Sequence, residues 1–250
     1  MEPKALIIRT AGINCDKETE FAFNSAGAKT DLQHISYVKE KSKLSDYQII
    51  CIPGGFSYGD DLGAGKIFSL ELLCWLKDQL KAFIDKGGLI LGICNGFQVL
   101  VKTGILPDLD FKQKVTLTDN DSGRFEDRWV YLKVVSKNIW LKDLPELISL
   151  PIAHGEGKFY TESSILDKIE SESKVALRYV DDSLNSAGYP FNPNGSLNDI
   201  AGITDASGRI LGLMPHPERN MFTHHSPFWK EKEIIPFGKI IFENAVDYFK

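Results

Sequence analysis

The sequence predicts an α/β fold in which an open, mostly parallel sheet is covered by helices on both faces. Three short apolar runs, at residues 5–8, 48–52 and 89–93, alternate with stretches of helix-like apolar spacing. Nearly continuous apolar strands separated by helices are typical of parallel sheets that are buried on both sides. Sheets of this kind place their ligand sites at the carboxyl ends of the strands.

Helices are predicted for residues 16–27, 69–86 and about 95–102. The first ends near a glycine and the second ends before a glycine pair, which are common helix stops. The third follows the strand at 89–93 directly, so the chain must turn sharply between them.

The second half of the chain is less regular. A polar stretch at 181–199, rich in Asn, Ser, Gly and Pro, is predicted to be a long surface loop. We also expect a C-terminal helix, and four further strands at 130–135, 175–180, 200–204 and 210–214. No change in composition marks a second unit, so we expect residues 1–250 to form one domain.

Composition narrows the class of protein. The 250 residues are 43% hydrophobic and 25% charged, which is ordinary for a globular protein. A net charge of −5, with no concentrated basic face, argues against nucleic-acid binding. The N-terminus lacks the pattern of a signal peptide, and no apolar stretch is long enough to cross a membrane. Four widely spaced cysteines do not suggest a disulfide or zinc framework, so we expect a reducing cytoplasm and no metal.

Cys94 is the candidate nucleophile, because it lies in the pattern G-x-C-x-G between a predicted strand and a predicted helix. This is the cysteine form of the nucleophile elbow. The glycines leave room for a strained turn, and the N–H groups at the helix start favour the reactive thiolate. The alternative is a buried structural cysteine, which we favour for Cys51 and Cys74. Cys15 fits neither description clearly.

The candidate base is His216, with Glu218 to orient it, in the sequence Met-Pro-His-Pro-Glu after the strand at 210–214. Because residues before proline avoid the helical region, we expect the segment to be extended, with both side chains on one side. A carboxylate can then hold one ring nitrogen while the other faces the thiol. His154, in Ala-His-Gly-Glu-Gly, is the rival base.

An oxyanion site is predicted from Pro53-Gly54-Gly55, which follows the apolar run at 48–52. A backbone N–H of this segment and that of Asn95 can together bind the oxygen of a tetrahedral intermediate. The alternative is an ordinary glycine turn. A phosphate loop is less favoured, because Gly65-Lys66 is followed by Ile67 rather than by Ser or Thr.

Taken in order, these three features resemble the class I glutamine amidotransferase family, whose triad is Cys-His-Glu. Longer strings, among them PGGFSYGDDLGAG, GICNGFQVL, SGRFEDRW, PIAHGEGKFY and LGLMPHPER, resemble the glutaminase subunits of phosphoribosylformylglycinamidine synthases. The resemblance covers about residues 5–219. The segment before Asn14 departs from the family pattern, which affects the assignment of that loop and not the triad.

The resemblance implies a flavodoxin-like sheet and a role for each motif. Cys94 would be the nucleophile, His216 the base and Glu218 its orienter. The N–H groups of Gly55 and Asn95 would form the oxyanion hole. The side chain of Gln98 would lie near the bound glutamine.

It also implies partners. Ammonia would pass to a larger synthetase subunit that uses ATP and magnesium to amidate formylglycinamide ribonucleotide in purine synthesis. A small third subunit would complete the complex, and this chain itself would carry no cofactor. The SGRFEDRW and PIAHGEGKFY segments would lie near the site or near the partner.

Three alternatives remain at this stage. The chain can serve a different synthetase, or act as a stand-alone cysteine hydrolase on a similar sheet. A non-catalytic binding module is the third, although all three triad candidates are present.

Overall fold

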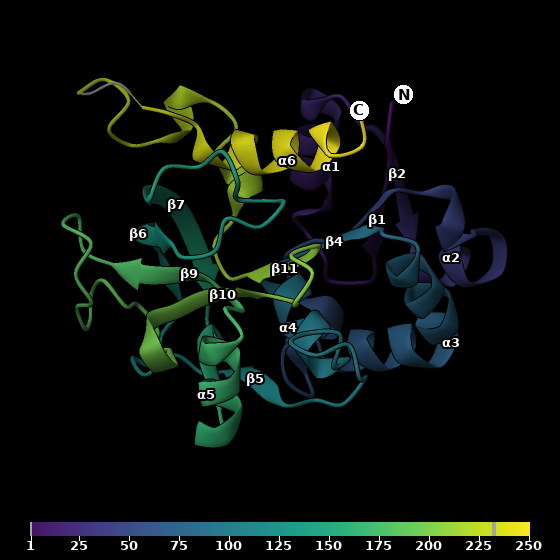
Figure 1. Ribbon diagram of the computed structural model, residues 1–250, viewed down its shortest axis with the longest axis horizontal. Helices are drawn as coiled ribbons and strands as arrows, with labels where there is room; N and C mark the ends of the chain where they lie inside the picture. Colours follow the sequence, from purple (N-terminus) through teal and green to yellow (C-terminus); the bar gives the residue numbers. More distant parts are fainter. Residues whose placement is uncertain (1, 232–233) are drawn as a thin grey trace.

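The computed structural model describes residues 2–231 and 234–250. Among these residues, nine strands form one twisted sheet in the order β2-β1-β3-β4-β11-β10-β9-β6-β7 (Figure 1). Five of them are mutually parallel: β1 (Lys4–Arg9), β2 (Lys29–His34), β3 (Ile49–Ile52), β4 (Leu89–Ile93) and β11 (Ile210–Leu213). The other four extend the sheet with antiparallel pairings: β10 (Ile200–Thr204), β9 (Val175–Val180), β6 (Glu126–Val134) and β7 (Leu147–His154).

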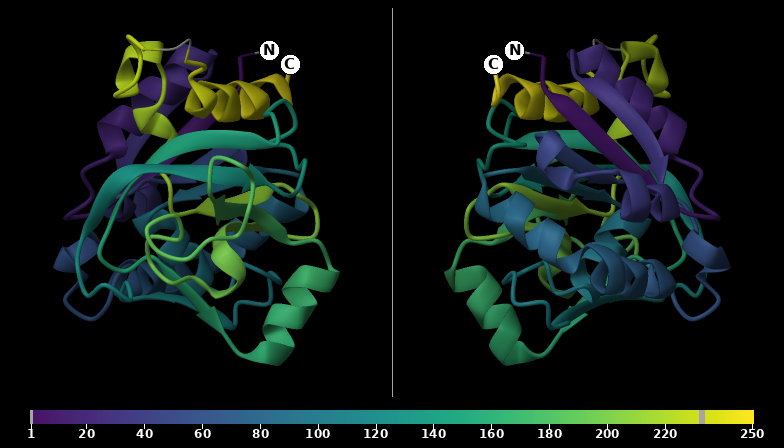
Figure 2. Two further views of the ribbon diagram at one scale, coloured as in Figure 1. Left: turned by 90° about the vertical axis from the view of Figure 1, so that its left-hand side faces the viewer. Right: turned by 90° about the vertical axis from the view of Figure 1, so that its right-hand side faces the viewer.

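Helices cover both faces of the parallel half. Helices α1 (Asp16–Ala26) and α6 (Phe237–Asp247) lie together on one face, where Phe23 and Phe242 meet edge to face at 4.8 Å (Figures 1 and 2). Helices α3 (Lys66–Asp85) and α4 (Asn95–Lys102) lie on the opposite face, with α2 (Ile35–Lys41) beside α3. The predicted α/β class is therefore confirmed.

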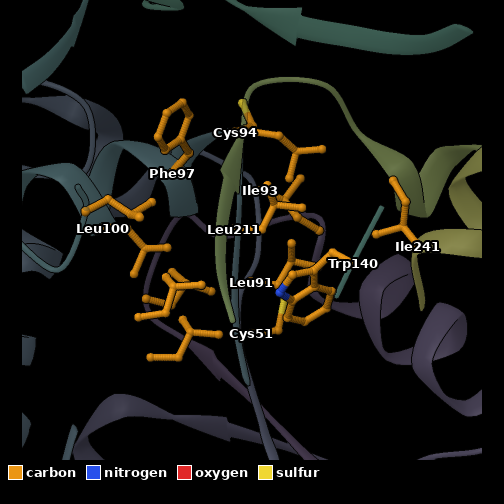
Figure 3. Packing of buried hydrophobic residues seen from close by; sticks show 14 of the residues in the cluster. Cys51, Leu91, Ile93, Cys94, Phe97, Leu100, Trp140, Leu211 and Ile241 are labelled. Carbon is orange, nitrogen blue, oxygen red and sulfur yellow. The ribbon is translucent and has the colours of Figure 1, made fainter. Parts of the chain in front are cut away.

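The apolar core lies in two layers, one on each side of the central strands. Figure 3 shows Phe97 and Leu100 of α4 on one side of β4, and Trp140 and Ile241 on the other. Cys94 lies at the end of the column formed by Leu91 and Ile93. The nucleophile candidate thus stands where the buried strand leaves the core.

A small second sheet carries two of the sequence motifs toward the same edge. It pairs β5 (Val115–Thr118) with β8 (Lys158–Thr161) in antiparallel register, and α5 (Ser163–Ser171) follows it. The loop after β5 and the loop before β8 meet, because the Asn120 N–H donates to the Gly155 carbonyl at 2.9 Å. Parts of SGRFEDRW and PIAHGEGKFY are held close together in this way.

The predicted strands and helices appear within a few residues of their expected positions, and the C-terminal helix is α6. Residues 232 and 233, in the segment that leads to it, lie outside the described residues. The sequence pattern predicts neither β2, which is polar, nor β7, whose pattern Pro151 interrupts. Both are edge strands, where weak alternation and proline are tolerated. The expected structural role for Cys74 is wrong, since that side chain is exposed.

None of the helices in the described ranges has the length and apolar character needed to cross a membrane.

Candidate active site

Cys94 occupies the predicted elbow between β4 and α4. Its backbone has φ 51° and ψ −106°, outside the regions that a residue with a side chain normally adopts. The Cys94 N–H donates to the Leu213 carbonyl at 2.8 Å, and the Cys94 carbonyl accepts the Gln98 N–H at 3.1 Å. Two ordered elements therefore hold the strained residue in place, as expected where strain belongs to a functional site.

The two glycines of the elbow are there for steric reasons. A Cβ atom on Gly96 would lie 1.8 Å from the Ile52 carbonyl oxygen of the neighbouring strand. A Cβ atom on Gly92 would lie 2.7 Å from the Gly96 carbonyl oxygen. No side chain fits at either position without moving backbone, so the pattern G-x-C-x-G records how closely β3, β4 and α4 pack.

His216 and Glu218 lie together just beyond β11. The His216 Nδ1–H donates to Glu218 Oε1 at 2.6 Å, and both side chains are almost fully buried. The prediction of an extended segment is wrong beyond His216, because Pro217–Arg219 form a turn of 3₁₀-helix. Proline suits the first position of such a turn, and the turn itself brings the carboxylate back to the ring.

The imidazole faces the thiol. A Cβ atom on Gly54 would lie 2.9 Å from His216 Cε1 and 3.4 Å from Cys94 Cβ, so both side chains adjoin the same point. His216 Nε2 is buried and has no hydrogen-bond partner among the described residues. The free nitrogen is the one that a base needs for the proton of the thiol.

Opposing effects act on the pKa of His216. Burial lowers it, but the negative charges of Glu218 and of a Cys94 thiolate raise it, and the net result lies well above the ordinary value for histidine. The site therefore favours the positively charged form of the His216 ring.

Cys15 also belongs to this site, although its sequence context predicts no role for it. Its Sγ lies 4.0 Å from His216 Nδ1 and accepts a hydrogen bond from Arg219 Nη2 at 3.2 Å. Burial raises the pKa of the Cys15 thiol. Cys15 lies in the string NCDKETEFAF, which resembles the same glutaminase subunits, but that resemblance gave Cys15 no role.

Cys15, His216 and Glu218 each offer a ligand atom within 4.8 Å of the others. Glu218 already holds the ring nitrogen nearest Cys15, and the Arg219 guanidinium adds a positive charge beside the thiol. These three side chains are therefore better suited to hold and orient a general base than to bind a metal cation.

The remaining predicted site residues also lie around Cys94. Gly55 lines the cavity that contains the thiol, and its φ of 143° is one that side chains rarely adopt. Asn95 begins α4, where the first N–H groups have no acceptor within the helix. Its side chain is buried and donates to Gln98 Oε1 at 2.9 Å. Gln98 lines the same cavity as Gly55.

His154, the rival base, is held by polar contacts at both of its ring nitrogens. Its Nδ1 pairs with Asn120 Oδ1 at 3.1 Å, and its Nε2 faces Asn194 Nδ2 at 3.5 Å. Burial lowers the pKa of His154 to about 3, with a further contribution from His216. A ring whose two nitrogens are both occupied, and which stays neutral, does not serve as the base.

Two adjoining cavities share the thiol. One, of about 300 Å³, contains Cys94 together with Asp60, Gln98, Arg124 and Glu156. The other, of about 210 Å³, extends from Cys94 toward Cys15, His216 and Arg219. The rings of Phe56 and Phe125 lie 6.2 Å apart and line both cavities.

Three charged groups of the larger cavity lie inside motifs that were noted in the sequence without residue roles. Asp60 belongs to PGGFSYGDDLGAG, Arg124 to SGRFEDRW and Glu156 to PIAHGEGKFY. The available signal was a charged residue beside a glycine in each of these strings. The last two strings were expected near the site or near the partner, and the structure shows that both reach the cavity at Cys94.

Known proteins resemble the whole chain. A model of the CobB/CobQ-like glutamine amidotransferase domain matches residues 2–249. A relative from Dehalococcoides mccartyi, named phosphoribosylformylglycinamidine synthase subunit PurQ, is 47% identical over 98% of this chain and 97% of its own. A protein of the same name from Treponema denticola is 46% identical over 99% of each chain.

Solved structures agree with this family. A chain in the structure of PurLQS from Thermotoga maritima aligns with a TM-score of 0.78 and 32% identity, covering 100% of both chains. A second Thermotoga maritima structure, titled a glutamine amidotransferase, shares the fold with a TM-score of 0.61 at 17% identity. The match of the domain model over nearly the whole length, and relatives of equal extent, show that this chain belongs to the family of CobB/CobQ-like glutamine amidotransferase domains.

Proposed function

We propose that the chain is the glutaminase subunit of a phosphoribosylformylglycinamidine synthase, and that it releases ammonia from glutamine at Cys94. The full-length relatives named PurQ support the assignment of the subunit. The observation that carries the chemistry is the arrangement of three groups: a strained thiol at a helix start, a buried imidazole nitrogen with no hydrogen-bond partner in the described part of the chain, and a carboxylate 2.6 Å from the other nitrogen.

The first half of the reaction forms a thioester. The Cys94 thiolate adds to the side-chain carbonyl carbon of glutamine, and the carbonyl electrons move onto oxygen. The N–H groups of Gly55 and Asn95 stabilise that oxyanion. When the carbon–nitrogen bond breaks, the His216 imidazolium gives its proton to the departing nitrogen. Ammonia leaves and a γ-glutamyl thioester remains.

The second half releases glutamate. Neutral His216 takes a proton from water, and the hydroxide adds to the thioester carbonyl. The carbon–sulfur bond then breaks, which restores the Cys94 thiolate and the imidazolium. Glu218 keeps the ring in one orientation and stabilises its positive charge through both halves.

The ammonia needs an acceptor, which is part of the proposal. The Thermotoga maritima structure, titled PurLQS, supports association with other subunits of a synthase. We assign ATP and magnesium to a larger synthetase subunit, which amidates formylglycinamide ribonucleotide, and we expect a small third subunit in the complex. The cytoplasmic location expected from cysteine usage belongs to the same proposal.

The test uses the chain purified with its partner subunits. In Cys94→Ala and Cys94→Ser, glutamine-dependent amidation should fall by at least about 10³-fold, while amidation with free ammonia should continue at the wild-type rate. Cys74→Ser is the matched control, because it changes an exposed cysteine of the same chain. Near-normal use of glutamine by Cys94→Ala would refute the proposed mechanism.

A further inference from the structure

The loop between β1 and α1 lies against the segment that carries the predicted oxyanion donor. The Phe56 N–H donates to the Gly12 carbonyl at 2.9 Å. The Cys15 N–H donates to the Gly54 carbonyl at 3.2 Å. The loop therefore holds the chain on both sides of Gly55.

The bond from Cys15 sets the direction of the Gly55 N–H. The Gly54 carbonyl and the Gly55 N–H belong to one peptide group, which is planar and trans, so they point in opposite directions. Because the carbonyl points to Cys15, the N–H points away from the loop, and it forms no hydrogen bond within residues 2–231 and 234–250. Gly55 lines both cavities that contain Cys94. The Cys15 N–H thus orients the group that is expected to bind the oxyanion.

The side chain of Cys15 is fixed beside His216. It is 1% exposed, and its Sγ lies 4.0 Å from His216 Nδ1. The thiol donates to Asn14 Oδ1 at 3.3 Å and accepts from Arg219 Nη2 at 3.2 Å. A Cβ atom on Gly54 would lie 3.2 Å from the sulfur, so the side chain also packs against the oxyanion segment. One residue therefore contacts both the peptide and the ring.

This geometry suits a support and not a second nucleophile. The Cys15 sulfur lies at Nδ1, the nitrogen that Glu218 holds, whereas the base uses Nε2 to take a proton. Burial, the largest effect, raises the pKa of the Cys15 thiol, so the group stays uncharged at neutral pH. A neutral thiol that contacts both Arg219 and the ring fills the space between them without adding a charge that competes with Glu218.

We propose that Cys15 is a positioning residue of the reaction: its N–H holds the Gly54–Gly55 peptide and its sulfur holds the His216 ring, so that the oxyanion donor and the base keep a fixed relation to Cys94. The inference rests on the proposed function and adds a residue that supports both reacting groups. These groups follow different strands, β3 and β11, and the loop after β1 joins them. The relation is worth fixing, because a displacement of about 1 Å can lower a rate about 10²-fold.

The first experiment removes the sulfur, in the chain assembled with its partner subunits. In Cys15→Ala, kcat for glutamine hydrolysis should fall by about 10- to 100-fold while KM stays within about twofold, because the reacting groups and not the substrate are misplaced. Cys15→Ser keeps a small acceptor for Arg219 and should recover kcat to within about fivefold of wild type. Cys51→Ala is the matched control: it removes another buried thiol, from β3, and should leave kcat within about twofold.

Titration of the His216 ring by nuclear magnetic resonance separates positioning from a general loss of stability. Burial has the largest effect on the pKa of His216, followed by the charges of Glu218 and Cys94, and the contact with Cys15 raises it further. Loss of the sulfur should therefore lower that pKa in Cys15→Ala, where Glu218 and Cys94 are unchanged. Cys51→Ala should keep the wild-type value.

The second experiment removes the N–H. Cys15→Pro lacks both the sulfur and the N–H, so it is compared with Cys15→Ala. A diazoketone analogue of glutamine alkylates Cys94 when its carbonyl lies in the oxyanion site: the carbon–sulfur bond forms, dinitrogen leaves, and the thiol proton passes to the diazo carbon. This rate should be at least about tenfold lower in Cys15→Pro than in Cys15→Ala. Iodoacetamide, which does not use the oxyanion site, should alkylate Cys94 equally fast in both.

The possible failures can be told apart. Association with the partner subunits and amidation with free ammonia should be normal in each variant, which shows that it is folded and assembled; if Cys15→Pro does not assemble, Cys15→Ala decides. The inference is overturned, and the proposed function stands, if assembled Cys15→Ala keeps the kcat of Cys51→Ala or the wild-type pKa of His216. Equal diazoketone rates in the assembled proline and alanine variants overturn it as well. If the wild-type complex releases no ammonia from glutamine, both are overturned.

Discussion

Among single residues, Cys94 shows how strain and charge combine at one atom. A positive φ at a residue with a side chain costs roughly 1–3 kcal/mol, and it persists only where the surroundings enforce it. Here Leu213 and Gln98 supply the hydrogen bonds that do so. The result is a buried thiol at the start of α4, in the lining of a cavity that also contains His216.

The bond between His216 and Glu218 leads to a prediction about charge. In Glu218→Gln the carboxylate that opposes the burial of the ring is lost, so the pKa of His216 should fall. We expect kcat for glutamine hydrolysis to decrease on the order of 10²–10⁴-fold, because the ring is neither oriented nor kept protonated for the departing nitrogen. KM should change little.

The two effects are measured separately. Titration of the His216 ring by nuclear magnetic resonance gives the change in pKa, and steady-state assays of the complex give kcat. Glu18→Gln is the control: it removes a carboxylate 2.9 Å from Arg219 on the exposed side, and it should leave kcat within about twofold. A His216 pKa that does not fall in Glu218→Gln would contradict the assigned role of the carboxylate.

At the scale of elements, the site depends on how closely α4 approaches the sheet. Gly96 lies against the Ile52 carbonyl of β3, and Gly92 lies against the first turn of α4. This contact fixes the angle between β4 and the helix, and thereby the direction in which Cys94 points. The pattern G-x-C-x-G is thus a packing requirement of the elbow as well as a marker of chemistry.

Gly96→Ala tests this contact. The added methyl group must displace the backbone of β3 or α4, and overpacking of this kind typically costs about 1–3 kcal/mol. We expect a loss of that size in the free energy of unfolding, measured with urea, and a lower rate of Cys94 alkylation because the thiol is reoriented.

Gly188→Ala is the matched control for that substitution. None of residues 2–231 and 234–250 has an atom within 4 Å of a Cβ atom at Gly188, so the free energy of unfolding should change by no more than about 0.5 kcal/mol. Equal stability of the two alanine variants would show that the elbow tolerates a side chain at Gly96.

For the whole molecule, a buried polar network joins loops that are far apart in sequence. His154 pairs with Asn120 and faces Asn194, and Asn194 Nδ2 also donates to the Gly157 carbonyl at 2.9 Å. This network holds the segments that carry Arg124 and Glu156 beside Cys94. Because His154 is buried in neutral form, its contribution to folding depends on pH.

The sign of that dependence follows from the pKa of about 3 in the fold and about 6.5 in the unfolded chain. Below pH 6.5 the unfolded chain binds a proton that the folded protein does not bind, so the free energy of unfolding falls as pH falls. From pH 7.5 to pH 5.0, His154 should account for a loss of about 2 kcal/mol.

His154→Gln removes the titrating group. At pH 7.5 it should lower the free energy of unfolding by about 1–3 kcal/mol, because hydrogen bonds are lost, but its further loss at pH 5.0 should be about 2 kcal/mol smaller than that of wild type. The opposite contribution of His216, whose raised pKa favours folding below pH 6.5 and less so above it, is present in both proteins and cancels.

Urea titrations at the two pH values provide the measurement. His224→Gln, which removes an exposed histidine, should keep the wild-type difference between them. The same difference in His154→Gln would refute a neutral buried His154.

Much of the fold was predictable because hydrophobic periodicity is a local property. The apolar strands β1, β3 and β4 and helix α4 follow directly from it. The edge strands β2 and β7 did not, because an edge position relaxes the pattern that reveals a strand. The exposure of Cys74 was not predicted, because which face of a helix is buried depends on the elements that pack against that helix.

The sequence by itself determined the elbow at Cys94, because the sterics of a few consecutive residues fix the local backbone there. It also predicted that His216 pairs with Glu218, which is two residues away, although the turn that joins them was not predicted. Only the tertiary structure decided that Cys15 adjoins His216, that His154 is held by two amides, and that Asp60 lies near Glu156. These contacts join loops from distant strands, and their geometry depends on how the sheet and its helices pack together.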